Sequence, residues 1–403
     1  MRFRDAYIPF GLSWTSPFAK WQGPLAEVNS LDLAVDVTGR ALEARGLPPE
    51  EITEWTLGCT VPQQYGFYGV TLVSRRLGAG RYGGPWLSRA CATSAVVVEH
   101  LATQVELGAH ATTIGVITDR TSNGPLMLYS SQRSTGGAPL AEHWVLDPMK
   151  LDPTTGQSMN DTAENTAVDG GYTREQVDEV TLMRYEQYLS SLADDRAVQR
   201  QYMVPVRLPR TKGGRGGKDG ADWVEEDHGV FPTTAEGLAK LSAVRPGGVV
   251  TYGSQTHPAD GCAGVVVATG DRARELGQDG VTAQILATGF GRAEPAYMPK
   301  APVEAARVAL ADAGIEMSDV DVVTTHNPFS VNDLWFSDQM GYPLERMNPY
   351  GSSLVYGHPQ GPTGARAITE LVHALHARGG GTGLFTGCAA GDSAGAVVVR
   401  VDG

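Results

Sequence analysis

Short apolar runs alternate along the chain with longer stretches in which apolar residues recur at helical spacing. One such stretch, over residues 30–46, begins at Ser30, which suits a helix N-cap, and ends at Gly46, which suits a helix stop. Helices that alternate with buried strands are typical of the α/β class, which is therefore the predicted fold class. The pattern predicts helices over 30–46, 302–314 and 364–380, and strands over 112–118, 249–254, 263–269, 321–325, 383–387 and 395–401.

The chain contains a faint internal repeat. Residues 91–120 run from a cluster of small residues through a predicted helix, a short loop and a predicted strand to a polar turn. Residues 361–392 show the same order of features. The repeat predicts two similar α/β halves related by a pseudo-twofold axis. The two repeated helices are then expected to lie side by side across that axis.

Residues 118–249 interrupt this pattern. They include a polar helical stretch over 171–195, which opens with a capping box at Thr173 and Gln176, and a basic, glycine-rich stretch over 207–220. Large insertions in α/β enzymes often shape the site, so we expect a loop domain over the first half. The predicted division is a first half of residues 1–117 plus 250–271, a loop domain of residues 118–249 and a second half of residues 272–403.

The balance of charge narrows the classes of partner. The 403 residues include 45 acidic and 32 basic ones, which gives a formal net charge of -13 at pH 7. Such a chain is poorly suited to general binding of nucleic acid or an anionic membrane. The N-terminus lacks the long apolar core of a signal peptide, and no apolar run reaches the length of a membrane helix. We therefore expect a cytoplasmic protein.

The four cysteines include no CxxC pair, so they fit neither a disulfide scaffold nor a zinc site. Cys91 stands just before the run ATSAVVVEH, where the positive end of a helix dipole would favour its thiolate. The alternative for Cys91 is a buried structural thiol. That interpretation suits Cys59 and Cys262, which lie in apolar surroundings.

Three further stretches carry reactive groups. His358 lies in GHPQGPTG, where glycines would let backbone and ligand approach the imidazole. Cys388 ends a predicted strand and enters a turn of small residues, whose backbone N–H groups could hold an oxyanion. His326 stands at the end of another predicted strand, in THNPFS, and strand ends are where α/β sheets place ligand groups.

Two cysteines and two histidines at strand ends and helix starts suit acyl transfer through a thioester. One cysteine attacks, a histidine takes its proton, and backbone donors hold the oxyanion. The second cysteine could act as acid and base on a carbon. A cysteine protease would also pair cysteine with histidine, but no protease signature surrounds Cys91.

The chain resembles the thiolase family of condensing enzymes nearly end to end. The combination is specific because the matching segments occur in the family's order. These segments are the opening IPFG, the nucleophile segment RACATSA, SMNDTAEN, TYGSQTHPADGCA, YGHPQGPTGAR and GCAAGDSAGA.

The resemblance implies a thiolase fold, in which two similar α/β halves form five layers (α-β-α-β-α) with an inserted loop domain. It also implies a homodimer or homotetramer. Cys91 matches the family's nucleophile, His358 the base that activates it, and Cys388 the acid/base at the α-carbon. The backbone N–H groups of Cys91 and Ala390 match one oxyanion hole. His358 and a water held by His326 match the other.

The family also implies acyl-CoA as substrate, with no metal and no permanently bound cofactor. The positions expected to contact substrate or CoA are Met159, Thr256, Phe329, Gly357, Arg215 and Lys218. In place of the family's loop-domain arginine, near the adenine end of CoA, this chain has Val230. The basic residues that could replace that arginine are Arg207, Arg210, Lys212, Arg215 and Lys218. The plain alternative for these residues is a solvated basic loop.

Two motifs depart from the family's pattern. The N-E-A-F motif reads His326-Asn327-Pro328-Phe329 here, so a histidine replaces the water-holding asparagine, as in some lipid-degrading thiolases. Imidazole can hold a water or donate directly. In C-x-G-G-G the oxyanion position is Ala390, which still offers an N–H but has less conformational freedom than glycine.

Three functions are consistent with these residues. A thiolase of fatty acid metabolism, which we favour, would cleave 3-ketoacyl-CoA with CoA or condense two acyl-CoAs. A decarboxylating, ketosynthase-like enzyme that uses an acyl carrier protein would employ Cys91, His326 and His358 but leave Cys388 idle. A weakly catalytic acyl-binding subunit of a hetero-complex is the third, although the chain has all the reactive positions.

Overall fold

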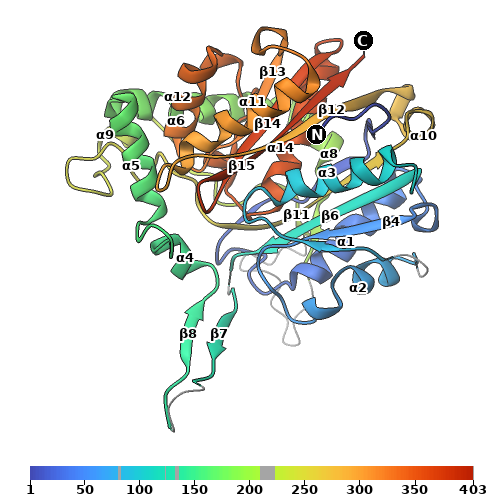
Figure 1. The fold of residues 1–403 in the computed structure, drawn as a ribbon, viewed down its shortest axis with the longest axis horizontal. Coiled ribbons are helices and arrows are strands. Elements are labelled where there is room, and N and C mark those ends of the chain that lie inside the picture. The colour runs from blue at the N-terminus through green and yellow to red at the C-terminus, as the bar shows by residue number, and fades with distance from the viewer. Residues whose placement is uncertain (80–82, 123, 132–135, 209–222, 403) are drawn as a thin grey trace.

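The computed structural model describes the chain apart from residues 80–82, 123, 132–135, 209–222 and 403. β-Strands run through the middle of the molecule, with helices on both sides (Figure 1). The strands of the first half are β4 (Glu54–Gly58), β5 (Trp86–Leu87), β6 (Thr112–Arg120) and β11 (Ala259–Ala268). Those of the second half are β12 (Thr282–Arg292), β13 (Val322–His326), β14 (Gly381–Ala389) and β15 (Ser393–Val401).

Strand β1 (Tyr7–Pro9) joins the two halves. It pairs with β11 on one side and β12 on the other, so the hydrogen-bonded order is β13-β14-β15-β12-β1-β11-β6-β4-β5. In the first half β4 runs parallel to β6, which is antiparallel to β11. In the second half β13 and β14 run parallel, and β14 is antiparallel to β15. This shared arrangement agrees with the predicted repeat. The short strands β2 (Ser13–Thr15) and β3 (Ala19–Lys20) lie along β11.

The helices of the two halves flank these strands. In the first half they are α1 (Ser30–Ala44), α2 (Gly69–Arg76), α3 (Thr93–Glu106) and α10 (Gly270–Leu276). In the second half they are α11 (Ala301–Ala313), α12 (Ser330–Met340), α13 (Ser353–Tyr356) and α14 (Pro362–Ala377). Among the described residues, no helix is both long enough and apolar enough to cross a membrane.

Side-chain alternation along the strands explains the layering. In β15, Val397 and Val399 join a core with α3 and α14, whereas Ala396 and Val398 join a core with α11 on the opposite face. Strand β11 divides its side chains in the same way between this central core and a core with α1. The result is five layers with α3 and α14 in the middle, which confirms the predicted fold class.

The two repeated helices, α3 and α14, lie side by side, as the repeat predicted. Ser94 Oγ, near the start of α3, donates to the Gly361 carbonyl at 2.5 Å and accepts from the Ala365 N–H at 2.8 Å. Helix α14 is buried along nearly its whole length, as expected for a central layer. Both helices therefore start at the junction between the halves.

Residues 249–254, predicted as a strand, form an irregular bend instead. Glu164 accepts from two backbone N–H groups of this segment, and Thr251 Oγ1 accepts from the Ser254 N–H. Side chains that satisfy backbone groups in this way compete with a strand ladder. Strand β6 also continues to Arg120, so the predicted domain boundary at 118 falls inside a strand.

The segment between β6 and β11 holds the inserted elements. They are β7 (Leu126–Tyr129), β8 (Leu140–His143), α4 (Leu146–Lys150), α5 (Met159–Gly170), α6 (Arg174–Ser191), α7 (Ala193–Arg196), α8 (Gln199–Tyr202), β9 (Val206–Arg207), β10 (Trp223–Val224) and α9 (Ala235–Ala239). The predicted capping box of Thr173 and Gln176 opens α6.

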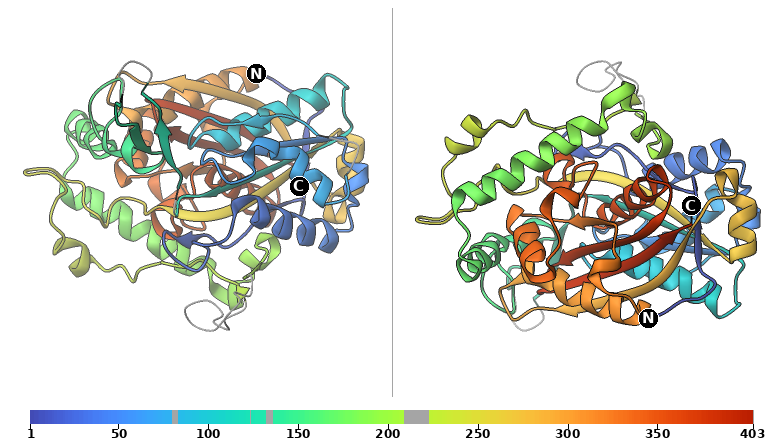
Figure 2. Two further views of the ribbon diagram at one scale, coloured as in Figure 1. Left: turned by 90° about the horizontal axis from the view of Figure 1, so that it is seen from below. Right: turned by 90° about the horizontal axis from the view of Figure 1, so that it is seen from above.

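Helices α5 and α6 pack against α12 of the second half, so the prediction of an insertion over the first half is wrong for these two helices. Apolar residues of α5 and α6, such as Ala163 and Val180, share a core with Leu334 of α12. Tyr172, between the two helices, donates from its hydroxyl to Asp338 at 2.7 Å. In the right-hand view of Figure 2, α6 (green) lies alongside the orange elements of the second half. The polar pattern predicted the helix but not the partner of its buried side.

Candidate active site

Cys91 stands in a tight turn two residues before α3. Thr93 Oγ1 holds this turn by donating to the Ala90 carbonyl at 2.7 Å and accepting from the Arg89 N–H at 2.8 Å. Ala90 has a φ of 45°, in the left-handed region that residues with a β-carbon rarely adopt. Backbone strain of this kind gathers at functional sites. Here it presents the Cys91 sulfur to the junction between the halves.

His358 faces that sulfur. Its Nε2 lies 3.1 Å from Cys91 Sγ, and its Nδ1 lies 2.7 Å from Thr363 Oγ1 in the first turn of α14. When Nδ1–H donates to Thr363, the lone pair of Nε2 is free to take the thiol proton. Gly357 precedes His358 with a φ of 87°, and an added β-carbon there would lie 2.6 Å from His257 Nε2. Only glycine fits this approach.

Burial sets the charge state of the pair. It raises the pKa of the Cys91 thiol to about 12, against the opposing effect of the backbone N–H groups of Ala390 and Cys91. Burial also lowers the pKa of His358 well below its usual value. The pair therefore rests as a neutral thiol and a neutral imidazole. Because both N–H groups reach the sulfur, the predicted oxyanion donors lie at the nucleophile.

Cys388 is the second thiol of this site; it is fully buried and lies near the end of β14. Asn332 Nδ2, on α12, lies 3.5 Å from Cys388 Sγ and donates to it. Among the described residues, Asn332 Oδ1 has no hydrogen-bond partner. Burial raises the pKa of Cys388, and the nearby sulfur of Cys91 raises it further. Gly387, directly before Cys388, pairs in register with His326, whose ring stacks on His358, the partner of Cys91. Both thiols therefore belong to one site.

His326 ends β13 and stacks on His358. The ring centroids are 3.9 Å apart and the ring planes are inclined by 19°. Burial lowers the pKa of His326 to about 3, so the ring is neutral. Its Nδ1 lies 3.1 Å from Ser353 Oγ, whereas its Nε2 is buried without a hydrogen-bond partner in the described part of the chain. A buried nitrogen of this kind suits a water or a ligand.

These side chains also include potential metal ligands. One ligand atom each from Cys91, His326 and His358 lies within 4.8 Å of the others, and thiolate and imidazole both bind zinc. An imidazole binds a metal through a lone pair in the plane of its ring. Two rings stacked nearly parallel at 3.9 Å share no such point. The arrangement suits proton transfer better than metal binding.

Two family models match the chain, the thiolase N-terminal domain over residues 13–271 and the thiolase C-terminal domain over residues 280–401. The chain belongs to the thiolase family. An acetyl-CoA acetyltransferase from Chromobacterium violaceum is 29% identical, over 94% of this chain and 95% of its own. A 3-ketoacyl-CoA thiolase from Pseudoalteromonas translucida is 27% identical, over 96% of this chain and 94% of its own. The solved structure of human mitochondrial 3-ketoacyl-CoA thiolase in complex with CoA shares the fold, with a TM-score of 0.87 at 23% identity over 98% of each chain.

The positions at which the thiolase resemblance implies substrate contacts adjoin the reactive groups. Phe329 stands at the N-cap of α12, and Met159 begins α5; both pack in the apolar cluster that contains Cys388. Thr256 Oγ1 donates to the carbonyl of Ser353, whose hydroxyl contacts His326. Apolar side chains and one hydroxyl therefore border the two thiols and two imidazoles.

The basic residues named for CoA lie in or directly before a segment outside the described residues. Four of them, Arg210, Lys212, Arg215 and Lys218, lie outside the described residues. Arg207 is exposed on β9 and lines a cavity whose walls include the carboxylates of Asp32 and Asp36. Asp32 pairs with Arg76 and Asp36 with Arg40, so the charge of this cavity is mixed and does not mark it as a phosphate site.

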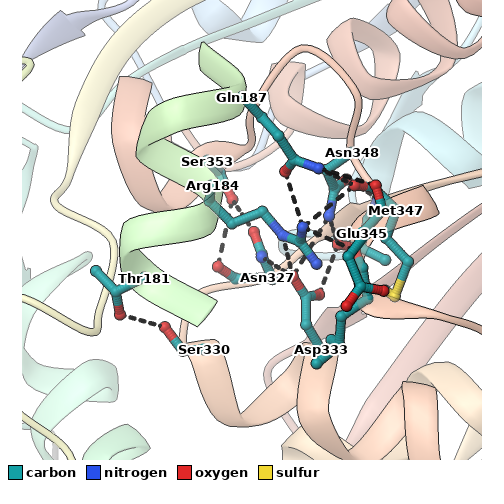
Figure 3. Close-up of polar contacts among 12 residues, drawn as sticks. Thr181, Arg184, Gln187, Asn327, Ser330, Asp333, Glu345, Met347, Asn348 and Ser353 are labelled. Atoms are coloured by element: carbon teal, nitrogen blue, oxygen red, sulfur yellow. Dashed lines mark hydrogen bonds and ion pairs between the residues drawn. The ribbon is translucent and has the colours of Figure 1, made fainter. Parts of the chain in front are cut away.

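A buried hydrogen-bond network joins α6 to Ser353, the side chain that contacts His326 (Figure 3). Arg184 Nε, on α6, donates to Asp333 Oδ2 at 2.8 Å, and Asn327 Nδ2 donates to the same oxygen at 2.6 Å. Ser353 Oγ, which contacts His326 Nδ1, lies 3.3 Å from Asn327 Oδ1 and donates to it. Both members of the Arg184–Asp333 ion pair are fully buried. The inserted helix α6 is thereby tied to the stacked rings.

The sequence does not reveal this network, because Arg184 and Asp333 are 149 residues apart. Nor does it single out Asp119, a buried carboxylate in β6. Asp119 accepts from the Gly361 N–H at 2.9 Å and the Thr60 N–H at 2.7 Å, and burial raises its pKa to about 6. This carboxylate ties the turn before α14 to the first half. The polar turn of the first repeat was its only signal in the sequence.

Proposed function

We propose that this protein is a thiolase-type acyl-CoA C-acyltransferase. It cleaves 3-ketoacyl-CoA with CoA or condenses two acyl-CoAs, by a ping-pong route through an acyl-enzyme on Cys91. The observation that carries this proposal is that Cys91 Sγ lies 3.1 Å from His358 Nε2 in a site that also holds Cys388. A nucleophile, a base that activates it and a second acid/base are what Claisen chemistry requires.

In the first half-reaction, His358 Nε2 takes the Cys91 proton as the sulfur attacks the acyl carbonyl. The carbonyl oxygen becomes an oxyanion, for which the N–H groups of Cys91 and Ala390 are the proposed donors. In the condensation direction the C–S bond to CoA then breaks, and the CoA thiolate takes the proton from His358. The acyl group remains on Cys91 as a thioester.

In the second half-reaction, Cys388 acts at carbon. For condensation, Cys388 first passes its proton to His358, which is neutral again after the first half-reaction. The Cys388 thiolate then takes a proton from the α-carbon of a second acyl-CoA, the carbanion attacks the acyl-enzyme, and the released Cys91 thiolate takes the proton from His358. Cleavage runs these steps in reverse, and the Cys388 thiol, which burial favours, then protonates the carbanion. His358 and a water held at Nε2 of His326, which has no hydrogen-bond partner among the described residues, are the proposed donors to the enolate oxygen.

A decarboxylating condensing enzyme is the second candidate, because ligand atoms of Cys91, His326 and His358 lie within 4.8 Å of one another. In that reaction the loss of CO2 forms the carbanion without a base. The contact of Asn332 with Cys388 would then have no task. Release of CO2 from malonyl-CoA by wild type and by Cys388→Ala separates the candidates, since only decarboxylation would survive the substitution. A weakly catalytic acyl-binding subunit would show neither activity.

Acyl-CoA, rather than an acyl carrier protein, is the proposed donor, with Lys20 in place of the loop-domain arginine. Lys20 packs on Gly229, directly before Val230, and a β-carbon added to Gly229 would lie 2.3 Å from Lys20 Cβ. Lys20 Nζ stands 4.3 Å from the ring centroid of Phe231, which is exposed. In the described part of the chain no carboxylate pairs with Lys20. An unpaired ammonium beside an exposed ring suits a nucleotide with its phosphates.

The homodimer or homotetramer remains part of the proposal. The β7–β8 hairpin projects from the body of the molecule in Figure 1, and it exposes Leu126, Leu128 and Leu140. Apolar side chains exposed together suit contact with another chain. Sedimentation of the purified protein measures this state. The cytoplasmic location stays a prediction.

A steady-state assay with 3-ketoacyl-CoAs of increasing chain length tests the proposed activity. Wild type is expected to consume CoA and the 3-ketoacyl-CoA and to form two shorter acyl-CoAs. Cys91→Ala is expected to lose this activity by a factor of about 1,000 or more, because no other group can carry the acyl chain. Absence of both cleavage and condensation at every chain length in wild type would refute the proposal.

A further inference from the structure

The loop of His358 brings another polar side chain to the nucleophile. Gln360 Oε1 lies 3.1 Å from Cys91 Sγ, the same distance as His358 Nε2. Gln360 is buried, with 7% of its surface exposed, and its φ is 62°, in the left-handed region. Glycine would adopt this backbone with less strain. A long polar side chain held in this conformation against the sulfur indicates a task there.

The thiol of Cys91 has one proton and two acceptors. That proton can point at His358 Nε2 or at Gln360 Oε1, and Oε1 holds the thiol whenever the proton is turned away from His358. Once His358 has taken the proton, the sulfur is an anion. A carbonyl oxygen 3.1 Å away then repels it. The same side chain hydrogen-bonds His358 and acts to raise its pKa, so this carboxamide orientation suits the thiol and the imidazolium but not the thiolate.

The other end of the carboxamide lacks a partner. Gln360 Nε2 is buried, and among the described residues it has no hydrogen-bond acceptor. A buried N–H donor without an acceptor is destabilising. Rotation by half a turn about the terminal torsion, which is soft, exchanges the oxygen and nitrogen positions. Nε2 then lies where Oε1 lay, and its N–H points at the sulfur.

We propose that Gln360 is a further catalytic residue, whose Oε1 accepts from the Cys91 thiol and whose Nε2, after a half-turn of the carboxamide, donates to the Cys91 thiolate. The S–H bond is the only bond that breaks in this step. Its proton passes to His358 Nε2, and the carboxamide keeps both of its own protons. The inference rests on the proposed function only in taking Cys91 as the nucleophile.

After the half-turn, the carboxamide adds an N–H donor to the Cys91 thiolate. Burial raises the pKa of Cys91 despite the two backbone N–H groups at its sulfur. A third donor acts on the charged form alone, because hydrogen bonds to ionised groups are stronger than those to neutral ones. Gln360 therefore favours proton transfer to His358. It also favours Cys91 as leaving group when the acyl chain departs.

Alkylation by iodoacetamide reports on the Cys91 thiolate without any acyl substrate. Its rate constant is measured at Cys91 by mass spectrometry, across neutral and alkaline pH, for wild type, Gln360→Glu and Gln360→Leu. The glutamate variant keeps the shape and an acceptor but lacks the N–H donor, and the leucine variant lacks both. We expect each variant to react about tenfold more slowly than wild type at neutral pH, which corresponds to a rise of about one unit in the pKa of Cys91.

Gln284→Leu is the matched control, because Gln284 on β12 bonds to the Arg4 carbonyl and takes no part in the site. It is expected to react as wild type does. If Gln360→Leu unfolds at a lower temperature than wild type, the test rests on the isosteric Gln360→Glu variant. Wild-type rate constants in a folded Gln360→Glu variant would overturn the role of Gln360. If the variants show the expected alkylation rates but wild type transfers no acyl group, the role of Gln360 is supported and the proposed function is contradicted. Failure of one proposal can therefore be distinguished from failure of the other.

Discussion

The imidazole rings of His326 and His358 lie face to face, with their centroids 3.9 Å apart. Both rings are buried, and burial lowers the pKa of each. Two imidazoles this close repel each other when both are charged, so the neutral stack is the resting state. When His358 takes the Cys91 proton, the single charge is held beside a neutral ring. This favours prompt transfer of the proton to a leaving thiolate.

The buried state of His326 predicts a pH dependence of stability. Its pKa is about 3 in the folded protein, against an ordinary value of 6.5. Because the folded pKa is depressed, the unfolded chain binds more protons between these values, and stability is lost as the pH falls through this window. We expect His326→Asn to reduce the slope of unfolding free energy against pH by up to about 1.4 kcal/mol per pH unit. Urea denaturation at a series of pH values measures this slope, and equal slopes in both proteins would contradict a buried neutral ring.

The two thiols are expected to separate the two half-reactions. Cys388→Ala retains Cys91 and His358, so it should still form the acyl-enzyme. It should fail to exchange the α-protons of acetyl-CoA with D2O, because the base at carbon is gone. Cys262→Ala, a buried cysteine in a different core cluster, is the matched control and should exchange normally. Full exchange of the α-protons by Cys388→Ala would contradict the proposal that Cys388 is the base at carbon.

The buried ion pair between Arg184 and Asp333 is expected to matter for both stability and activity. Arg184→Met leaves a buried carboxylate uncompensated, which costs about 3–5 kcal/mol. Arg174→Met, on the same helix, breaks a more exposed pair with Asp178 and should cost clearly less. Urea denaturation compares the two variants. Equal losses of unfolding free energy in the two variants would mean that the buried network next to His326 stabilises the fold no more than a partly exposed ion pair does.

Lys20 is expected to act on the nucleotide part of the substrate alone. Lys20→Gln should raise KM for acetyl-CoA by about tenfold, as expected for the loss of one phosphate contact. KM for the acetyl thioester of N-acetylcysteamine, which lacks the nucleotide, should not change. Lys150→Gln, an exposed lysine at the end of α4, is the control. A parallel rise in KM for both substrates would contradict a phosphate contact.

Much of the site was predictable because the repeat carries geometric information. Cys91 and His358 each precede one of the two repeated helices, and a pseudo-twofold axis brings those helix starts together. Strand ends meet at one edge of a sheet, so His326 and Cys388 belonged to the same region. These four positions could be predicted from the order of elements and the residue types at the ends of those elements.

Other features depend on contacts that the order of elements does not determine. In the sequence, Arg184 does not differ from the other charged residues of a polar helix. Its complete burial against Asp333 is seen only in the structure. Gln360 fills a variable position of the G-H-P-x-G motif, and its approach to Cys91 follows from a positive φ that the sequence does not reveal. Residues 249–254 are rich in strand-forming types, yet Glu164 and hydroxyl side chains take their backbone groups.

The central claim is that Cys91 carries the acyl group. Intact-protein mass spectrometry after mixing with acetyl-CoA, or with 3-ketoacyl-CoAs of several lengths, tests it most directly in wild type and Cys91→Ala. The account predicts one acyl adduct on wild type and none on the variant, with the favoured chain length giving the highest occupancy. An adduct that persists in Cys91→Ala, or no adduct on wild type from any CoA ester, would contradict it.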